Sequence, residues 1–270
     1  MTPTRRTLIA PALFCVGSVL VSPAQSRIGI MQLIPIAENP GDTLISIPFE
    51  YEQGLGTPPG VPSPRLITLD PLISLRISEQ VNLFTTALVP ASLTAQREGE
   101  GQRIDLGDVQ VTLMVSPSRH RDLLWGVGPV VKLPTATIPE RVTDRWGLGP
   151  SLFVMHHAAG DPWVYGIGVQ HFWSIGPGHG PREDRLTIEP FLTYDLSEHL
   201  YLAASPEITA AWGRPPEDRW TVPVGGGIGT RVQFGKTILN LTISAYYNAI
   251  RAAEQSEWTL SLKLGWTICK

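Results

Sequence analysis

The 270-residue sequence has two cysteines, few charges and, beyond its first residues, no long apolar run. Cys15 lies in an N-terminal segment that we expect to be removed, which leaves Cys269 alone and excludes an internal disulfide from the mature chain. Only 17% of the residues are charged, and the net charge is −3. Because nucleic-acid binding normally needs a basic face, this balance disfavours it. No window after the N-terminal segment reaches about 18 apolar residues without a charge, which excludes a membrane protein built of helices.

The first 24 residues have the pattern of a secretory signal peptide. Arg5 and Arg6 give it a basic start, Leu8 to Val21 form an apolar stretch, and Ser22 and Ala24 are small residues before the expected cleavage point. The apolar stretch is too short for a spanning helix, which needs about 20 residues. The arginine pair also fits a twin-arginine signal, but such a pair is ordinary in a basic start, so we favour the ordinary signal.

The abundant residues are glycine and proline, with 26 and 25 copies. Together they make up 51 of 270 residues, well above their usual share of about 12%. Each costs about 1 to 3 kcal/mol inside a helix, so this composition disfavours a helical bundle and a helix-rich α/β enzyme. It favours many short strands joined by turns. A hydrophobic content of 43% with little net charge also disfavours disorder.

Period-two alternation of apolar and polar residues is the clearest pattern in the sequence. From Trp258 to Ile268, apolar residues alternate with threonine, serine, lysine and glycine, which defines a strand with one apolar and one polar face. Similar segments predict about twelve strands, each about ten residues long, which is the length that crosses a bilayer at a tilt near 45°. The predicted strands lie near residues 44–52, 65–76, 80–90, 104–116, 122–133, 146–157, 162–174, 185–195, 199–212, 219–234, 236–248 and 257–268.

The connections between these strands fall into two alternating classes. Short and long loops alternating along an even number of strands are typical of an outer-membrane barrel with tight periplasmic turns and longer outer loops. We therefore predict an all-β fold, a single antiparallel transmembrane β-barrel in the outer membrane of a Gram-negative bacterium, with both termini periplasmic. The short connections are 77–79, 158–161, 196–198 and 235; the long ones are 53–64, 91–103, 134–145, 176–184, 213–218 and 249–256; 116–121 is intermediate.

All eight tryptophans fall on the apolar parity of a predicted strand and close to a strand end. Tryptophans at strand ends form the two girdles at the membrane interfaces of outer-membrane barrels, whereas a soluble core would hold them mid-strand. The alternative is a soluble secreted barrel whose tryptophans cap its open ends, and such a protein would be recovered without detergent. The predicted membrane girdle consists of Trp125, Trp146, Trp163, Trp173, Trp212, Trp220, Trp258 and Trp266.

Prolines and glycines recur inside the predicted strands. A proline removes one hydrogen bond of the ladder, so the strand-interior prolines predict a shared level at which strands bend or bulge. The glycines are expected to point inward, where they leave room in the lumen or let an inserted segment approach the wall. The prolines are Pro71, Pro129, Pro150, Pro190, Pro206 and Pro223; the glycines are Gly126, Gly128, Gly147, Gly149, Gly166, Gly168, Gly225, Gly227 and Gly229.

The expected organisation has three parts. A signal peptide occupies residues 1–24, and the barrel occupies residues 44–270. Residues 25–43 lie between them and include Ile28 to Ala37, a run too apolar for a free tail. We expect this segment to be periplasmic or to plug the barrel.

Eleven polar and charged residues fall on the inward parity of the strands. One interpretation is a self-satisfied interior, in which acid–base pairs such as Glu189 or Glu207 with Arg231 fill a narrow lumen. The other is that these groups line a passage and set its selectivity, as rings of charge do in other pores. The candidate pore-lining residues are Asp70, Arg76, Asn82, Gln110, Lys132, Gln170, Glu189, Glu207, Arg231, Asn240 and Lys263.

Six phrases that occur in order carry a family resemblance: Trp125 to Pro129 with Leu133 to Thr137, Trp146 to Pro150, Glu189 to Tyr194, Ser205 to Trp212, Arg219 to Gly229 and Ala245 to Asn248. On these phrases, the chain resembles the bacterial outer-membrane family labelled as a MetA-pathway phenol-degradation transporter, in some cases as neuromedin U. The resemblance runs along nearly the whole mature chain, from about Ile45 to Ile268. It implies an outer-membrane barrel, although the label says little about the substrate. Family members usually end on an aromatic residue, whereas this chain ends in Ile268, Cys269 and Lys270.

Patterns of catalytic residues are weak. His171 and Ser174 fall on opposite faces of a strand and so cannot form a dyad alone, and His156 and His157 also split between faces. Metal-ligand spacings are missing, and Gly225 to Gly229 lacks the helix start and the lysine of a phosphate loop. We therefore expect no enzyme, no cofactor and no metal.

The sequence thus predicts a passive channel or uptake barrel for small molecules, with aromatic and hydrophobic compounds as candidate solutes. Its expected partners are outer-membrane lipids, the barrel-insertion machinery and a small-molecule solute, and no nucleic acid. The alternative is a structural or adhesive barrel with a closed lumen, whose outer loops bind a partner.

Overall fold

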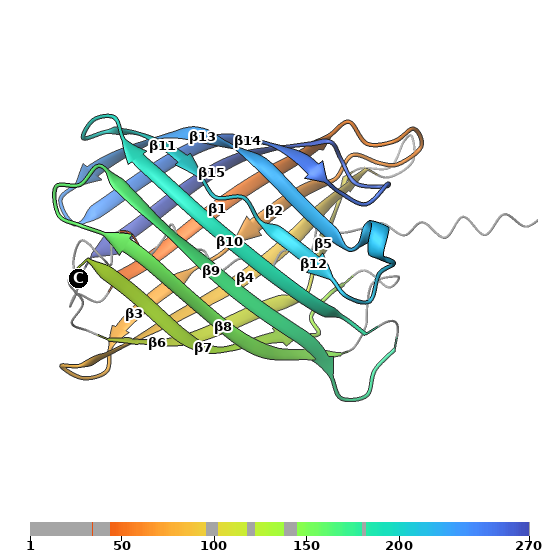
Figure 1. Ribbon diagram of the computed structural model, residues 1–270, viewed down its shortest axis with the longest axis horizontal. Helices are drawn as coiled ribbons and strands as arrows, with labels where there is room; N and C mark the ends of the chain where they lie inside the picture. Colours follow the sequence, from red (N-terminus) through yellow and green to blue (C-terminus); the bar gives the residue numbers. More distant parts are fainter. Residues whose placement is uncertain are drawn as a thin grey trace, which may run out of the picture.

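Fifteen strands of the computed structural model form one sheet that closes on itself, because β1 pairs with β15 as well as with β2 and β3 (Figure 1). The structure describes residues 44–95, 102–117, 122–137, 145–179 and 182–269, together with Ile34. The expected signal peptide lies outside the described residues. Residues 25–43 do too, apart from Ile34. The strands are β1 (Leu44–Leu55), β2 (Arg65–Leu69), β3 (Leu72–Arg76), β4 (Val81–Ala95), β5 (Gln102–Leu106), β6 (Val109–Pro117), β7 (Leu123–Leu133), β8 (Trp146–His157), β9 (Trp163–Ile175), β10 (Asp184–Asp195), β11 (Leu200–Ala204), β12 (Ile208–Ala211), β13 (Trp220–Phe234), β14 (Thr237–Ile250) and β15 (Trp258–Cys269).

Three spans of the barrel wall are each broken into two strands, so the fifteen strands make twelve spans. The breaks lie at residues 70–71 between β2 and β3, at 107–108 between β5 and β6, and at 205–207 between β11 and β12. All pairings along the wall are antiparallel. The predicted all-β antiparallel barrel of about twelve strands is therefore confirmed.

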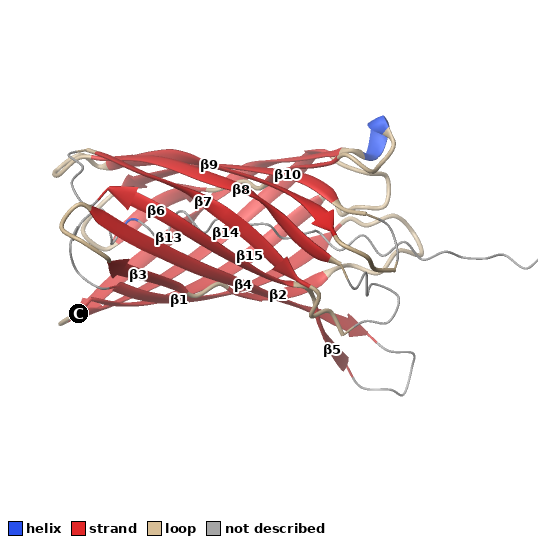
Figure 2. Cartoon of the chain, turned by 90° about the horizontal axis from the view of Figure 1, so that it is seen from below, coloured by secondary structure: helices blue, strands red, loops and turns tan. Residues whose placement is uncertain are grey.

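The loops sort by length as the sequence predicts. The short turns lie at the same end of the barrel as the C-terminus, and the longer connections rim the other end, where the 3-10 helix Pro216–Asp218 also lies (Figure 1). Figure 2 shows β5 and the end of β4 projecting beyond the barrel wall at this long-loop end. Among the described residues, no helix is long and apolar enough to span a membrane.

All six strand-interior prolines lie at interruptions of the ladder. Pro71 and Pro206 lie in breaks between strands, and β13 has a register shift at Pro223. Pro129 and Pro150 lie opposite each other on β7 and β8, at the level where β7 and β8 each leave the ladder with their other neighbour. At Pro190, β10 stays in register with β9, but on its other side the ladder is interrupted between Ile188↔Ile208 and Leu192↔Ala204. A missing N–H donor explains the interruptions, because proline cannot complete the ladder.

The glycine that precedes proline in each Trp-Gly-x-Gly-Pro phrase is required by a close backbone approach. A Cβ atom at Gly128 would lie 1.8 Å from the carbonyl oxygen of Leu113, and one at Gly149 would lie 1.7 Å from that of His171. Any side chain there would collide with the backbone of the neighbouring strand. The repeated phrase therefore builds the same local distortion twice, on adjacent strands.

Other inward glycines are covered by aromatic rings. A Cβ atom at Gly126 would lie 2.4 Å from the Phe153 ring, and one at Gly229 would lie 2.3 Å from the Tyr201 ring. The ring from the neighbouring strand occupies the space that the missing side chain leaves. The prediction that these glycines leave open room in the lumen is therefore wrong at both positions.

An apolar cluster fills part of the barrel interior toward the short-turn end. Its members come from β1, β3, β4 and β6 to β10, and Ile34 packs against it from the segment that precedes β1. The rings of Phe84 and Phe153 lie 5.9 Å apart between centroids. The cluster consists of Leu44, Leu72, Phe84, Met114, Leu124, Phe153, Met155, Val164 and Phe191.

The outer face of the wall is apolar. Large side chains on the outward parity stay exposed, for example Leu260, Leu262 and Leu264 on β15, while the alternating positions Ser261 and Thr267 are buried. A closed barrel satisfies its backbone hydrogen bonds within the wall, and an apolar outward face is stable against lipid. The alternation that predicted the strands thus reflects a lipid-facing and an interior face.

Candidate functional site

Inward side chains are buried unevenly around the barrel. On β6 to β10, here called the filled arc, most inward positions are buried, among them Phe153 and Phe172. On β11 to β13, here called the broken arc, inward positions such as Ser205, Thr221 and Gly227 stay half-exposed. Solvent therefore reaches the interior face mainly along the broken arc.

The ladder of the broken arc is interrupted and is bridged by side chains. Pairing of β11 with β13 ends at Ala203↔Gly227, and pairing resumes between β12 and β13 at Thr209↔Thr221. Within this interval the Tyr246 hydroxyl accepts a hydrogen bond from the Ser205 backbone N–H at 3.0 Å. The Ser205 hydroxyl in turn donates to Glu189 Oε1 at 2.8 Å. This chain connects β14 to β10 across β13.

The eleven candidate pore-lining residues fall into three groups. Asp70, Asn82, Gln110, Lys132, Gln170 and Glu189 are buried, with exposed fractions between 1% and 6%. Glu207, Arg231, Asn240 and Lys263 are half-exposed, and all four lie between residue 205 and the C-terminus. Arg76 is exposed beside a short turn, where its Nε donates to the Ser78 carbonyl at 3.3 Å.

Several candidate residues contact one another or residues on neighbouring strands. Gln170 Nε2 donates to Gln110 Oε1 at 3.1 Å, and Lys263 Nζ lies 3.4 Å from Glu50 Oε2. Arg231 forms an ion pair with Asp195, and its guanidinium lies 5.1 Å from the centre of the Tyr201 ring. Arg231 thus pairs with a carboxylate from the end of β10, a partner that the sequence pattern did not suggest.

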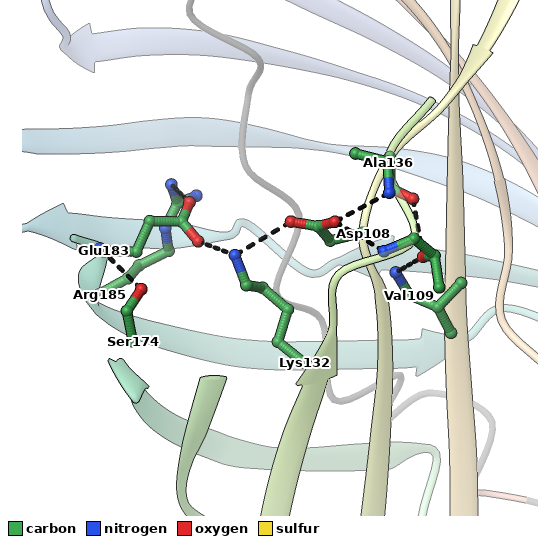
Figure 3. A network of polar contacts seen from close by, with 9 residues as sticks. Asp108, Val109, Lys132, Ala136, Ser174, Glu183 and Arg185 are labelled. Carbon is green, nitrogen blue, oxygen red and sulfur yellow. Dashed lines mark hydrogen bonds and ion pairs between the residues drawn. The ribbon is translucent and has the colours of Figure 1, made fainter. Parts of the chain in front are cut away.

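Four charged residues form a continuous chain at the long-loop end of the filled arc, here called the outer bridge: Asp108, Lys132, Glu183 and Arg185 (Figure 3). Lys132 Nζ lies 3.0 Å from Asp108 Oδ2 and also contacts Glu183 Oε2. Arg185 lies 3.4 Å from the other oxygen of Glu183. The Lys132 side chain is only 4% exposed, so this ammonium is neutralised inside the protein by two carboxylates.

Lys132 reaches from β7 across β8 and β9 to the start of β10. Gly147 on β8 leaves the necessary space, because a Cβ atom there would lie 2.9 Å from Lys132 Cβ and 3.5 Å from its Cε. The ammonium lies 5.9 Å from the centre of the Phe172 ring on β9, a cation–π contact. The first glycine of the second Trp-Gly-x-Gly-Pro phrase is therefore explained by the path of a lysine.

The Asp108 carboxylate of the outer bridge also holds backbone, and the backbone of Glu183 is itself held by a side chain. Asp108 Oδ1 accepts hydrogen bonds from the N–H groups of Thr135 and Ala136, each at 3.0 Å. The Ser174 hydroxyl accepts from the Glu183 N–H at 2.9 Å. Figure 3 shows these contacts converging from separate strands. One lysine thus links the β5–β6 junction, the start of the β7–β8 connection and the end of the β9–β10 connection.

Glu183 is ionised more readily than an ordinary glutamate. Burial by itself would raise the pKa of its carboxyl group, but the charges of Arg185 and Lys132 and the hydrogen bond from Lys132 outweigh burial and hold the pKa below its ordinary value of 4.5. Glu183 therefore carries its negative charge at neutral pH.

The sequence pattern predicts only part of the outer bridge. The inward parity makes Lys132 a candidate pore-lining residue, but the candidates do not include Asp108, Glu183 or Arg185. Asp108 shares its parity with Gln110, and Arg185 shares its parity with Glu189, so both carried a signal. Glu183 fell in a connection, where parity predicts no direction. Glu50 and Asp195, the ion-pair partners of Lys263 and Arg231, lie on the inward parity of predicted strands and were also missed.

The predicted girdle tryptophans lie on the outward face near both ends of the barrel. Trp125, Trp163 and Trp266 lie near the short-turn end, and the other five lie near the long-loop end. Seven of the eight are 39% to 55% exposed, and Trp220 is half-buried. Trp212 and Trp220 pack edge to face, 5.9 Å apart between ring centroids. Two rims of exposed tryptophan are the arrangement that membrane interfaces favour.

Residues considered for catalysis or metal binding have other contacts. Ser174 is buried on the inward face and bonds to Glu183, whereas His171 lies 2.6 Å from Asp184 on the outward side and packs against Trp173. Serine and histidine are thus on opposite faces of β9. Within the described ranges, no group of three or more histidine, cysteine or acidic residues is placed to hold a metal ion.

Solved structures with the same arrangement of strands come from outer-membrane proteins. An outer-membrane channel from Pseudomonas putida F1 superimposes with a TM-score of 0.61 at 13% sequence identity, covering 85% of this chain and 96% of that one. The NanC porin superimposes with a TM-score of 0.52 at 11% identity, covering 84% and 99%. The fold is that of an outer-membrane barrel. No protein-family model matches the chain, and no curated protein matches it.

Proposed function

We propose that this chain is a channel of the Gram-negative outer membrane through which small molecules pass by diffusion. The observation that carries the proposal is the contrast in burial around the interior. Toward the long-loop end, inward positions of the broken arc such as Ser205, Thr221 and Gly227 are small or polar and half-exposed, whereas most inward positions of the filled arc are packed. A polar, accessible strip inside a lipid-facing barrel is a route for solutes.

The solutes proposed are small molecules that include aromatic and hydrophobic compounds. Support comes from the resemblance to the phenol-degradation family, whose membership stays part of this proposal. Two outer-membrane proteins of similar fold are a channel and a porin, which fits the proposal without identifying a solute. The eleven inward polar residues and the eight girdle tryptophans keep the roles proposed for them, and insertion would depend on the cellular barrel-insertion machinery.

Residues 25–43 are proposed to act as a plug at the short-turn end. Ile34 packs against the apolar cluster inside the barrel, which is the contact expected of a plug residue. The same cluster favours the second candidate function, a structural or adhesive barrel whose interior is closed.

Planar-bilayer recording separates the two candidate functions. We expect the purified mature protein to conduct, and deletion of residues 25–43 to increase its conductance. If neither protein conducts although both are folded barrels by heat-dependent gel mobility, the channel proposal is wrong and the closed barrel is favoured.

Liposome swelling with a panel of phenols, sugars and amino acids then identifies the solute class. Recovery of the mature chain without detergent would contradict the membrane assignment.

A further inference from the structure

The buried charges of the outer bridge are not needed to close the barrel wall, because backbone hydrogen bonds close it. Removing an ammonium from water is costly, and a buried charge is stable only when it is paired and hydrogen-bonded. Lys132 meets this condition with two carboxylates that come from different connections. The pairing therefore depends on the relative positions of those connections, and in turn restrains them.

The restraint extends along the rim beyond the four residues of the outer bridge. Arg145, at the end of the β7–β8 connection, donates to the carbonyl of Gly176 at 3.1 Å, and so joins that connection to the one between β9 and β10. On the other side, Glu207 and Arg214 act electrostatically on Arg185, and Arg214 lies 3.5 Å from Glu254. Charges of alternating sign thus follow the long-loop end of the barrel.

The outer bridge borders the route proposed above without lying in its accessible part. Lys132 lies against the filled arc, over Gly147 and Phe172, and its side chain has little contact with solvent. Arg185 is the last of the four residues of the outer bridge, and its charged neighbour Glu207 lies in the interrupted part of the broken arc. The outer bridge therefore occupies the boundary between the packed and the accessible parts of the mouth.

We propose that the outer bridge limits the width and the charge selectivity of the outer mouth, with Lys132 as the positioning residue. This inference rests on the proposed channel function. With Lys132 present, Asp108 and Glu183 are held together by one cation. Without it, two carboxylates repel each other across the mouth, the segments that they anchor separate, and negative charge faces the route.

The test replaces the ammonium and keeps the chain length. For Lys132→Met we expect single-channel conductance to rise roughly two-fold. The cation-to-anion permeability ratio should rise in the same proportion, and the reversal potential in a salt gradient measures it. Lys236→Met is the matched control, because Lys236 is an exposed lysine in the short turn at the opposite end. We expect the control to match the wild type. Equal conductance and selectivity in wild type and Lys132→Met would overturn the proposal.

A second variant and a folding assay separate failure of this proposal from misfolding of a variant and from failure of the channel function. Glu183→Gln removes one carboxylate and keeps the size of the side chain, so it should also raise conductance but lower the cation-to-anion permeability ratio, the opposite of the change expected for Lys132→Met. Heat-dependent gel mobility reports whether each variant is a folded barrel. If wild-type protein is folded and does not conduct, the channel function fails; if it conducts and both variants conduct identically to it, only the role of the outer bridge fails.

Discussion

The filled arc and the broken arc share one sequence pattern, strands of alternating residues interrupted by glycine and proline, yet they close the wall by different means. On the filled arc the interruptions at Pro129 and Pro150 lie beside glycines that let neighbouring backbones approach closely, and aromatic rings cover the inner face. The broken arc also has a close-approach glycine at Gly227 and a ring over Gly229, but there the ladder stops, and Tyr246 and Ser205 join its sides by hydrogen bonds. Interruption of a ladder is thus compatible with a packed wall or with an accessible one, depending on the side chains next to it.

The largest effect is expected for glycine on the filled arc. Gly149→Ala would place a Cβ atom 1.7 Å from the His171 carbonyl oxygen, whereas Gly226→Ala on the broken arc would place one 2.9 Å from that of Ala203. We expect Gly149→Ala to cost more than about 4 kcal/mol and to prevent assembly, and Gly226→Ala to assemble. Heat-dependent gel mobility after refolding into detergent distinguishes the two, and equal assembly would contradict the proposed contrast.

A smaller loss of stability is expected from the apolar cluster. Phe153 is fully buried, covers Gly126 and contacts Phe84, so Phe153→Ala should lower the free energy of unfolding by about 3 to 5 kcal/mol. Tyr201→Phe on the broken arc removes only a hydrogen bond to Thr242 and should cost about 1 kcal/mol. Urea titration of the refolded proteins in lipid measures both, and similar costs would mean that the arcs are packed alike.

Acid should lower the free energy of unfolding by removing the ion pairs of Glu183 at the long-loop end of the filled arc. Because the pKa of Glu183 is lowered in the folded protein, its ion pairs contribute stability that is present above pH 4.5 and is lost as the pH falls through the lower folded pKa. We expect the wild type to lose more stability than Glu183→Gln between pH 5 and pH 3. Unfolding titrations at the two pH values measure this difference, and parallel losses in both proteins would show that Glu183 does not contribute.

The smallest effect concerns charge on the broken arc. Glu207 is a half-exposed carboxylate in the interruption between β11 and β12. Glu207→Gln should lower the cation-to-anion permeability ratio by less than roughly two-fold, since other charges remain near the route. The buried Ser151→Ala on the filled arc serves as the comparison and should leave the ratio unchanged, because Ser151 is 1% exposed and is not among the pore-lining candidates. A larger change from Ser151→Ala would reverse the assignment of the route.

Most of the wall could be predicted from the sequence, because its signals are local. Alternation along a single strand marks both faces, and short connections alternate with long ones. Proline lacks an N–H group wherever it occurs, so Pro71, Pro206 and Pro223 marked real interruptions without knowledge of their neighbours. Pro190 follows the same rule, since β10 leaves the ladder with β11 and β12 between Ile188↔Ile208 and Leu192↔Ala204.

The interior could not be predicted to the same depth, because its contacts depend on how strands are staggered around the barrel. Lys132 and Glu183 belong to elements separated by β8 and β9, and they meet only through the length of one lysine and the space at Gly147. Likewise, parity places Gly126 on the inward face but does not reveal the Phe153 ring above it. Parity predicts the direction of a side chain and not its partner.

The seam between the first and the last strand has a consequence for the chain's connectivity. β1 and β15 pair without interruption from Leu44↔Cys269 to Leu55↔Trp258, so the wall is complete where the barrel's own ends meet. Those ends are neighbours, and a short turn could join them. A circularly permuted barrel, opened instead in the connection between β12 and β13, should therefore assemble with the same set of strand pairs, and its chain ends would then lie beside the interrupted part of the wall.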